Sequence, residues 1–332
     1  MTYRKICVIH LNQIGDLMFS LPLLKSLRDR FPEAQIHSLL RPSLTGLLED
    51  SPYVDRIIPR RDALFSRLKL LWSLRRERYD LVISLPRSEE ALLLTMMSNA
   101  QVKAGFYRWP WDRGLDVKEV LQGHYSWFNF SKLLARLDIP VSQDTYVGLL
   151  RVDEPLRVEG LPWRYAVISP GASSRRQSKQ WDERKYASVI TELSMMFGLS
   201  CVLVGGGDAV DLTRRISEHV HPSLDGGVRQ VVDLAGKISL RELAAVLKKA
   251  KLFVGIDSGV MHMASALDVP TVAIFGPTDP RYSGPQNNRS LVVRKDLPCS
   301  PCYLREDCSH RRCLEELDAA SVVESCRRVL EP

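Results

Sequence analysis

The chain has 332 residues, of which 45% are hydrophobic, 26% charged and 8% aromatic, and its formal net charge is +7. This is ordinary globular composition with no low-complexity signature. No apolar run approaches the roughly 18–20 residues that cross a bilayer, and the N-terminus lacks a cleavage-site pattern, so we exclude an integral membrane protein and expect a cytoplasmic location. Chains beyond about 250–300 residues usually split, which predicts two domains.

The first half of the chain alternates short apolar runs with segments of helical spacing. Short runs that predict strands lie at residues 5–11, 33–40, 54–60 and 80–86. Helical spacing follows at residues 17–31, 44–50, 64–79 and 127–139. Strands that alternate with helices in this way indicate right-handed βαβ units and a mostly parallel sheet. Between Gly105 and Gly160 the sequence is rich in aromatic residues and only weakly periodic.

The alternation restarts after a segment with prolines, a glycine and mixed charge at residues 153–164, which predicts a domain seam. Strands are expected at residues 165–171, 200–208, 252–257 and 270–276, and helices at 182–198, 209–220, 239–250 and 258–267. The pattern predicts two doubly wound α/β domains in series, at residues 1–155 and 156–315. Residues 316–332 are expected to form a further helix.

Ligands of doubly wound folds bind outside the carboxyl ends of the strands, so the loops that follow strands come first. Asp16 follows the first strand and a permissive turn at Gly15, near the start of a helix. A carboxylate in that place fits an N-cap, stabilised by the free N–H groups of the first turn. It also fits a general base that takes a proton from an acceptor hydroxyl. Both interpretations remain open at this point.

Three loops of the second half have the chemistry of a phosphate site. Ser173, Ser174 and Lys179 lie in a small, hydroxylic and basic loop. Three glycines precede Asp208, but without the spacing of the dinucleotide fingerprint, which argues against an NAD-linked dehydrogenase. The sharpest feature is the strand end that carries Asp257, Ser258, Gly259 and His262, because a helix N-terminus there would offer N–H groups to a diphosphate. No Asp-x-Asp pair follows a strand, so no metal is expected there.

The chain holds seven cysteines, and four of them gather near the C-terminus. Cys299, Cys302, Cys308 and Cys313 have the spacing C-x2-C-x5-C-x4-C. This spacing fits a structural zinc site, two disulfides or reduced thiols that line a loop. The other three cysteines lie in strand-like or helix-like patterns, as small apolar residues would, which favours a reducing compartment.

Five ordered segments resemble glycosyltransferase family 9, the ADP-heptose:lipopolysaccharide heptosyltransferases, nearly end to end. They are GDLMFSLPLLKSL, SPGASSRRQSKQW, VLVGGGD, DLAGKISLRELAAVL and GIDSGVMHMASALDVPTVAIFGPTDP. The cysteine-bearing tail is similar to one in the heptosyltransferase II-like branch. The resemblance implies a GT-B fold, with two Rossmann-like doubly wound domains facing across a cleft and the C-terminal helix returning toward the first domain. It also implies an inverting transfer that needs no metal or cofactor.

The resemblance assigns roles to the residues above. Asp16 would be the general base, while Lys179, Ser173 and Ser174 would bind the diphosphate of an ADP-heptose donor. Residues Asp257, Ser258, Gly259 and His262 would cradle the donor. The backbone near Ile238 would contact adenine, and Asp208, or Asp211 in its place, the ribose. Gln180 departs from the basic residue that the family usually has after its lysine.

A basic stretch from Arg56 to Arg78 suits an anionic partner, although such runs are often plain solvated surface. The resemblance implies a phosphorylated lipid A–core acceptor, with peripheral contact at the inner membrane and no nucleic acid. The helix in this stretch carries Leu64, Leu68, Leu71 and Trp72. This apolar stripe is expected to be buried on the sheet, with contact to the inner leaflet as the alternative. A nucleotide-sugar epimerase and a non-catalytic glycolipid-binding or nucleotide-sugar-binding protein are the competing functions.

Overall fold

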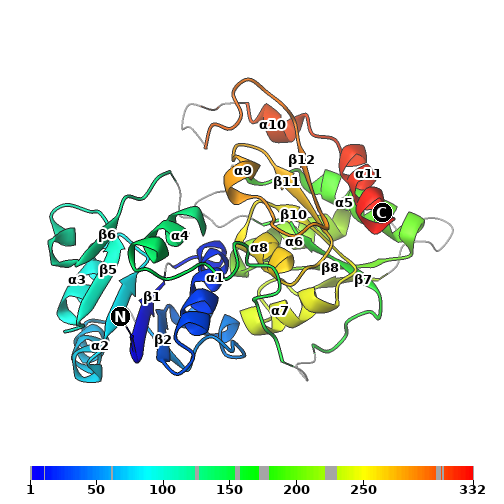
Figure 1. The fold of residues 1–332 in the computed structure, drawn as a ribbon. Helices are drawn as coiled ribbons and strands as arrows, with labels where there is room; N and C mark the ends of the chain where they lie inside the picture. The colour runs from blue at the N-terminus through cyan, green and yellow to red at the C-terminus, as the bar shows by residue number, and fades with distance from the viewer. Residues whose placement is uncertain are drawn as a thin grey trace. The chain divides into compact units, whose positions relative to one another are not determined.

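The computed structural model describes residues 2–10, 12–60, 63–123, 127–153, 158–171, 179–220, 230–303, 308 and 310–331. The chain divides into two compact units, Met1–Val152 and Asp153–Pro332, coloured blue to green and green to red in Figure 1. The division falls at the start of the segment 153–164, three residues before the end of the first predicted domain at residue 155. Each unit has its own six-stranded sheet.

The first unit is built on a parallel sheet whose strand order is β3-β2-β1-β4-β5-β6. Its strands are β1 (Lys5–Ile9), β2 (Gln35–Leu40), β3 (Arg56–Pro59), β4 (Leu81–Ser84), β5 (Val102–Phe106) and β6 (Val117–Glu119). Its helices are α1 (Ile14–Arg30), η1 (Pro42–Leu47), α2 (Leu64–Glu77), α3 (Glu89–Met97), η2 (Trp111–Gly114) and α4 (Trp127–Arg136). Strand β1 lies at the centre, where Val8 pairs with Ser38 on one side and Ile83 on the other.

The second unit repeats this topology, with the order β12-β11-β10-β7-β8-β9. Its strands are β7 (Tyr165–Ser169), β8 (Ser200–Leu203), β9 (Val231–Asp233), β10 (Leu252–Ile256), β11 (Thr271–Phe275) and β12 (Ser290–Arg294). Its helices are α5 (Glu183–Phe197), η4 (Gly207–Ala209), α6 (Val210–His219), α7 (Leu240–Lys249), α8 (Gly259–Ala266), α9 (Pro280–Ser283), α10 (Arg312–Glu315) and α11 (Ala319–Leu330). Counted from its first strand, each sheet has the order 3-2-1-4-5-6, so the expected doubly wound fold is confirmed twice.

The central strands are buried along their whole length because helices cover both faces of each sheet. Every residue of β4, β7, β8, β10 and β11 is buried, as the unbroken apolar runs of these strands predict. The edge strands β3, β6, β9 and β12 are only partly buried. The ends of these central strands are therefore held in place by a rigid core.

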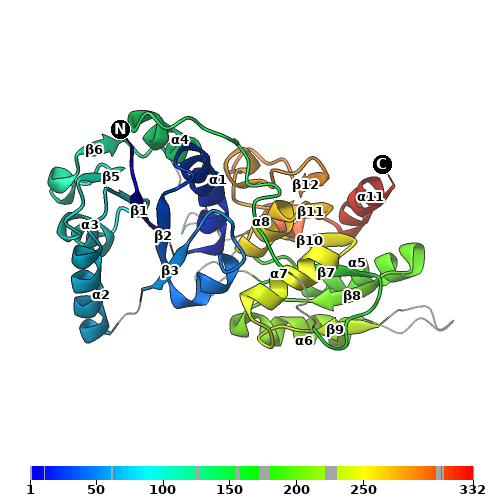
Figure 2. The ribbon, with the colours of Figure 1, turned by 60° about the horizontal axis from the view of Figure 1, so that its bottom comes forward.

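The terminal helix α11, expected to turn toward the first domain, packs on α5 and on β10, β11 and β12 of the second unit (Figure 2). Val322 and Cys326 are its fully buried side chains. Leu317 lies just before α11, and its carbonyl accepts two hydrogen bonds, from the indole of Trp181 at 3.1 Å and from Lys185 Nζ at 2.9 Å. Residues 316–331 thus complete the core of the second unit.

Candidate functional site

The strand order places a switch point in each unit, where the chain winds outward in both directions from the first strand. In the first unit it lies between β1 and β4, and in the second between β7 and β10. Asp16 follows β1, Lys179 follows β7, and Asp257 follows β10. The predicted base and two predicted donor-binding residues therefore lie beside the strands where this fold binds ligands.

Lys179 and Asp257 form a buried ion pair at the switch point of the second unit. Lys179 Nζ donates to Asp257 Oδ2 at 2.6 Å and approaches the Asp257 carbonyl at 3.5 Å, and the two residues are 5% and 8% exposed. Thr278, which follows β11, donates its hydroxyl to the same carboxylate oxygen at 2.7 Å. The side chains thus join three loops at the carboxyl edge of one sheet.

The charge of this cluster follows from its burial and its partners. Burial alone would raise the pKa of Asp257, but Lys179, His262 and the hydrogen bonds from Lys179 and Thr278 together lower it. Burial also lowers the pKa of His262 to about 4, against the opposing effect of Asp257. At neutral pH the cluster therefore holds an ammonium, a carboxylate and a neutral imidazole.

Helix α8 begins directly beside this pair. Ser258 is its N-cap and accepts a hydrogen bond from Met261 N at 3.4 Å. The first N–H groups of a helix have no partner within the helix, and they carry the positive end of its dipole. The amides at Ser258, Gly259 and Val260 and the ammonium of Lys179 thus form a positive surface at one strand end, which suits phosphate oxygens.

The glycine run after β8 serves close packing. A methyl group at Gly205 would meet Ala209 Cβ at 2.5 Å, and one at Gly171 would meet the same atom at 2.9 Å. Gly236 has φ +69°, and a Cβ there would lie 3.0 Å from Val210. The loops after β7, β8 and β9 can therefore approach one another closely because side chains are absent at these points.

The other predicted donor-binding residues have different outcomes. Asp208 is exposed in η4, and Asp211 is exposed and lies 3.7 Å from the guanidinium of Arg214. Ile238 is half-buried in the turn between β9 and α7. These three residues lie in loops or helix starts at the carboxyl edge of the second sheet. Ser173 and Ser174 lie outside the described residues.

Asp16 is not the N-cap of α1, so that interpretation is wrong. The cap position is Gln13, whose side chain makes no capping hydrogen bond, and Asp16 lies in the first turn, half-buried. Asp16 lies three residues after the cap position, because the helix begins at Ile14, before the glycine. A carboxylate in the first turn still gains from the helix dipole.

Sequence reasoning missed a buried polar network around His10, the residue that follows β1. Ser20 Oγ donates to the Leu17 carbonyl at 2.7 Å, so it accepts from His10 Nδ1 at 3.0 Å. The other ring nitrogen, Nε2, then accepts from Ser38 Oγ at 3.1 Å. Burial lowers the pKa of His10 to about 3, so the ring is neutral. His10 directly follows β1, and its partners Ser20 and Ser38 lie 10 and 28 residues away, so no local pattern in the sequence pointed to this network.

All seven cysteines are free thiols, so no disulfide joins the C-terminal four. Across the described parts of the chain, no group of three or more His, Cys, Asp or Glu side chains is placed to hold a metal ion. Both ends of the cysteine segment meet the turn after β11: Cys302 N donates to the Pro277 carbonyl at 3.0 Å, and a Cβ at Gly276 would lie 2.7 Å from Leu314. The segment therefore supports the loop that carries Thr278.

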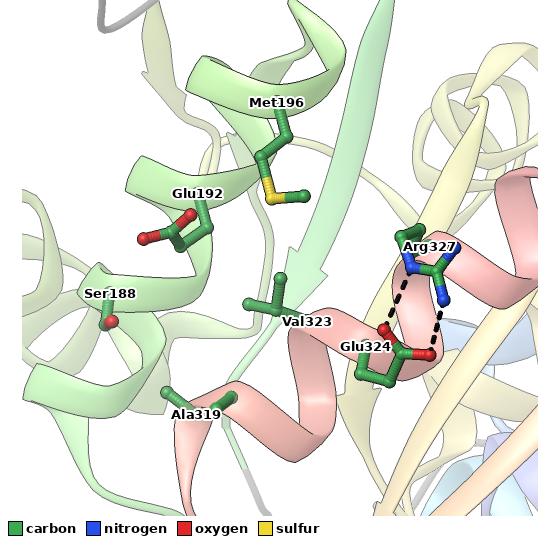
Figure 3. A pocket seen from close by; sticks show the side chains of 8 residues that line it. Ser188, Glu192, Met196, Ala319, Val323, Glu324 and Arg327 are labelled. Atoms are coloured by element: carbon green, nitrogen blue, oxygen red, sulfur yellow. Dashed lines mark hydrogen bonds and ion pairs between the residues drawn. The ribbon is translucent and has the colours of Figure 1, made fainter.

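A separate pocket of about 340 Å³ lies on another face of the second unit, between α5 and α11 (Figure 3). Its walls include Met196, Glu192 and Val323, and an ion pair between Glu324 and Arg327 lies along α11. None of the predicted site residues lines it. Its mixed apolar and acidic walls do not suit a diphosphate.

Two Rossmann-like units in series, with a positive strand-end site in the second, have the architecture of the GT-B fold. A model of glycosyltransferase family 9 (heptosyltransferase) matches residues 67–312, and the chain belongs to this family. No helix in the described ranges is long and apolar enough to cross a membrane.

Individual proteins similar to this chain in sequence or structure are heptosyltransferases or members of family 9. The chain is 29% identical over 297 residues to lipopolysaccharide heptosyltransferase 3 of Escherichia coli, covering 83% of this chain and 85% of that protein. The structure of E. coli ADP-heptose lps heptosyltransferase II matches with a TM-score of 0.77 and 24% identity, covering 98% of each chain. A family 9 glycosyl transferase from Veillonella parvula matches with a TM-score of 0.85 and 20% identity, covering 99% of this chain and 98% of that one.

Proposed function

We propose that this protein transfers heptose from ADP-heptose to a hydroxyl of the lipopolysaccharide inner core, with inversion at the anomeric carbon and without a metal ion. Support comes from the family, from a relative named as a lipopolysaccharide heptosyltransferase, and from a structural neighbour named for ADP-heptose. The lipid A–core acceptor implies work in the cytoplasm, with peripheral contact at the inner membrane.

The observation that carries the proposal is the buried ammonium of Lys179 beside the N-terminus of α8. An ammonium has three N–H donors, and two of those of Lys179 are directed at Asp257. Asp257 and Thr278 thereby fix the lysine, whose remaining donor can bind a diphosphate oxygen. Together with the amides at Gly259 and Val260, it would stabilise the negative charge that grows on the leaving ADP.

The second half of the reaction belongs to Asp16. Its carboxylate would take the proton from the acceptor hydroxyl as that oxygen attacks the anomeric carbon. The bond from this carbon to the diphosphate oxygen breaks on the opposite face, so the configuration inverts and ADP leaves with its electron pair. The carboxylate would also favour the oxocarbenium-like transition state.

Further residues would orient the donor. The backbone at Ile238 would contact adenine and Asp208 the ribose, while Ser258 and His262 would hold the first turn of α8. His262 would do so as a neutral ring, since its pKa is about 4. Ser173 and Ser174 would add hydroxyl donors to the diphosphate.

The test is turnover of ADP-heptose with a heptose-deficient core acceptor, followed as ADP release, with and without EDTA. The proposal predicts one ADP per transferred sugar, an inverted linkage and no loss of rate with EDTA. Absence of turnover with every truncated core would refute it. Formation of an isomerised sugar from the donor alone would identify an epimerase. Full complementation of a strain with a truncated core by the Asp16→Ala variant would identify a non-catalytic binding protein.

A further inference from the structure

Helix α2 has one apolar face on the core and another toward solvent. Leu70 and Leu74 are buried in the core cluster of the first unit, and Leu71 packs against it. Leu68 and Trp72 are exposed, which contradicts the expectation that the whole stripe is buried. The side chain of Leu64 lies outside the described residues. The core needs only the Leu70–Leu74 side of the helix.

The solvent face of α2 is a ridge of large apolar side chains, here called the α2 ridge: Phe65, Leu68 and Trp72. They are 85%, 56% and 59% exposed. Spacings of three and four residues place them on one side of a helix, at about 100° per residue. Leu70 and Leu74 project from the opposite side. A row of three such residues is more than the isolated exposed side chains that a soluble surface usually shows.

Cations border the α2 ridge on both sides. By helical position, Arg75 lies on one flank, and Lys69 and Arg76 lie on the other. The Arg76 guanidinium lies 4.1 Å from the centre of the Trp72 ring. Among the described residues no carboxylate pairs with these three cations. The one acidic residue of α2, Glu77, is bound to Lys5 and Arg56.

We propose that the α2 ridge docks the protein on an anionic phospholipid bilayer, with Phe65, Leu68 and Trp72 in the interface and Lys69, Arg75 and Arg76 at lipid phosphates. This inference rests on the proposed function, because a lipid A–core acceptor is itself embedded in a bilayer. A helix with an apolar strip bordered by Lys and Arg, carrying Trp and Phe, has the composition of interfacial helices.

The charge of the α2 ridge's border favours an anionic bilayer over a second copy of the chain as the partner of this surface. A two-fold interface through the α2 ridge would bring the same three cations of each copy together, and like charges at close range oppose association. An anionic lipid surface instead attracts each of them. The neighbouring helix α3, which packs on α2 (Figure 1), carries a further exposed apolar side chain, Leu93.

Flotation with vesicles of phosphatidylcholine and phosphatidylglycerol, compared with pure phosphatidylcholine, tests the inference without donor or acceptor. Each basic residue near an anionic surface strengthens binding about fivefold, so K69Q/R75Q/R76Q should weaken binding about a hundredfold. F65S/L68S/W72S should weaken it at least as much. Both variants should keep the parent melting temperature, because the replaced side chains are exposed.

Matched controls distinguish the α2 ridge from general stickiness. Trp163 is exposed outside α2, so W163S should bind vesicles as the parent does. The exposed Arg184 and Arg328 of the second unit serve the same purpose in R184Q/R328Q. Equal losses in these controls, equal binding to neutral vesicles, or a dimer that is abolished by F65S/L68S/W72S would overturn the inference.

The two proposals fail separately. The ridge variants should keep the parent rate on a soluble, delipidated acceptor and lose rate only on acceptor held in vesicles. Vesicle binding without any sugar transfer would remove the proposed function alone. Sugar transfer by a protein that never binds anionic vesicles would remove the docking surface alone.

Discussion

Breaking the buried pair of Lys179 and Asp257 should destabilise the second unit strongly. Lys179→Met leaves a carboxylate that is 8% exposed, with Thr278 as the remaining side-chain donor among the described residues. Asp257→Asn leaves an ammonium that is 5% exposed. Removal of one partner of a buried ion pair costs about 3–5 kcal/mol, since the other charge stays buried without compensation. The double variant K179M/D257N removes both charges, so it should recover about 2–3 kcal/mol of the summed loss.

The effect has a defined pH dependence. The folded protein lowers the pKa of Asp257, so its contribution to stability is present above the unfolded value of about 3.9 and is lost as pH falls through the folded value. In Lys179→Met, burial without the cation should raise this pKa instead. The difference in unfolding free energy between parent and variant should therefore be largest near pH 7 and shrink below about pH 5.

Urea unfolding of parent, single and double variants, followed by circular dichroism, measures these differences. Lys251→Met provides a control, because Lys251 is an exposed lysine and its loss should change stability by less than about 0.5 kcal/mol. Calorimetry with ADP separates stability from binding: the stable double variant should still bind ADP about 10- to 100-fold more weakly than the parent, because the charge-assisted bond is gone. Losses below about 1 kcal/mol in both single variants would refute the buried-pair account.

Three further predictions follow from other residues. Asp16→Asn should lower the rate of transfer by about 10²- to 10⁴-fold with little change in ADP affinity, and near-normal turnover would contradict its role as base. His10 stays neutral in the folded protein, whereas in the unfolded chain it takes up a proton below about pH 6.5, so the free energy of unfolding falls by about 2 kcal/mol per such histidine by pH 5. In His10→Asn the slope of unfolding free energy against pH should correspond to one proton fewer. An unchanged slope would exclude a buried neutral ring. Gly255→Ala should destabilise by about 1–3 kcal/mol, because its Cβ would lie 2.7 Å from the Ser169 carbonyl; an unchanged melting temperature would contradict the tight pairing of β7 and β10.

Most inner strands and the edge strand β3 could be predicted from the sequence, whereas β5, β6, β9 and β12 could not. Strands such as β8 and β11 are short, unbroken apolar runs, which is the pattern of a strand buried on both faces. Strand β6 has three partly buried residues, β5 is interrupted by Lys103 and Gly105, and β12 is followed by charge, so their patterns are too short or too polar to recognise. Helix α3 has apolar residues on every side, which hides the helical period; its cap Ser88, which accepts from Ala91 N, was the usable signal.

The site could be predicted as a set of loops but not as a set of contacts. The switch points follow from the alternation of strands and helices, and they contain Asp16, Lys179 and Asp257. The ion pair joins residues 78 positions apart, and only the packing of β7 beside β10 makes it possible. The partition of α2 into a core face and an exposed ridge depends likewise on which side meets the sheet, and the apolar spacing alone allows either.

A crystal structure of the protein with ADP tests the central claim most directly. The account predicts the diphosphate against the amides of Ser258, Gly259 and Val260, with Lys179 Nζ within hydrogen-bond distance of a phosphate oxygen and adenine beside Ile238. A diphosphate seated elsewhere, with Lys179 bound to Asp257 alone, would contradict it.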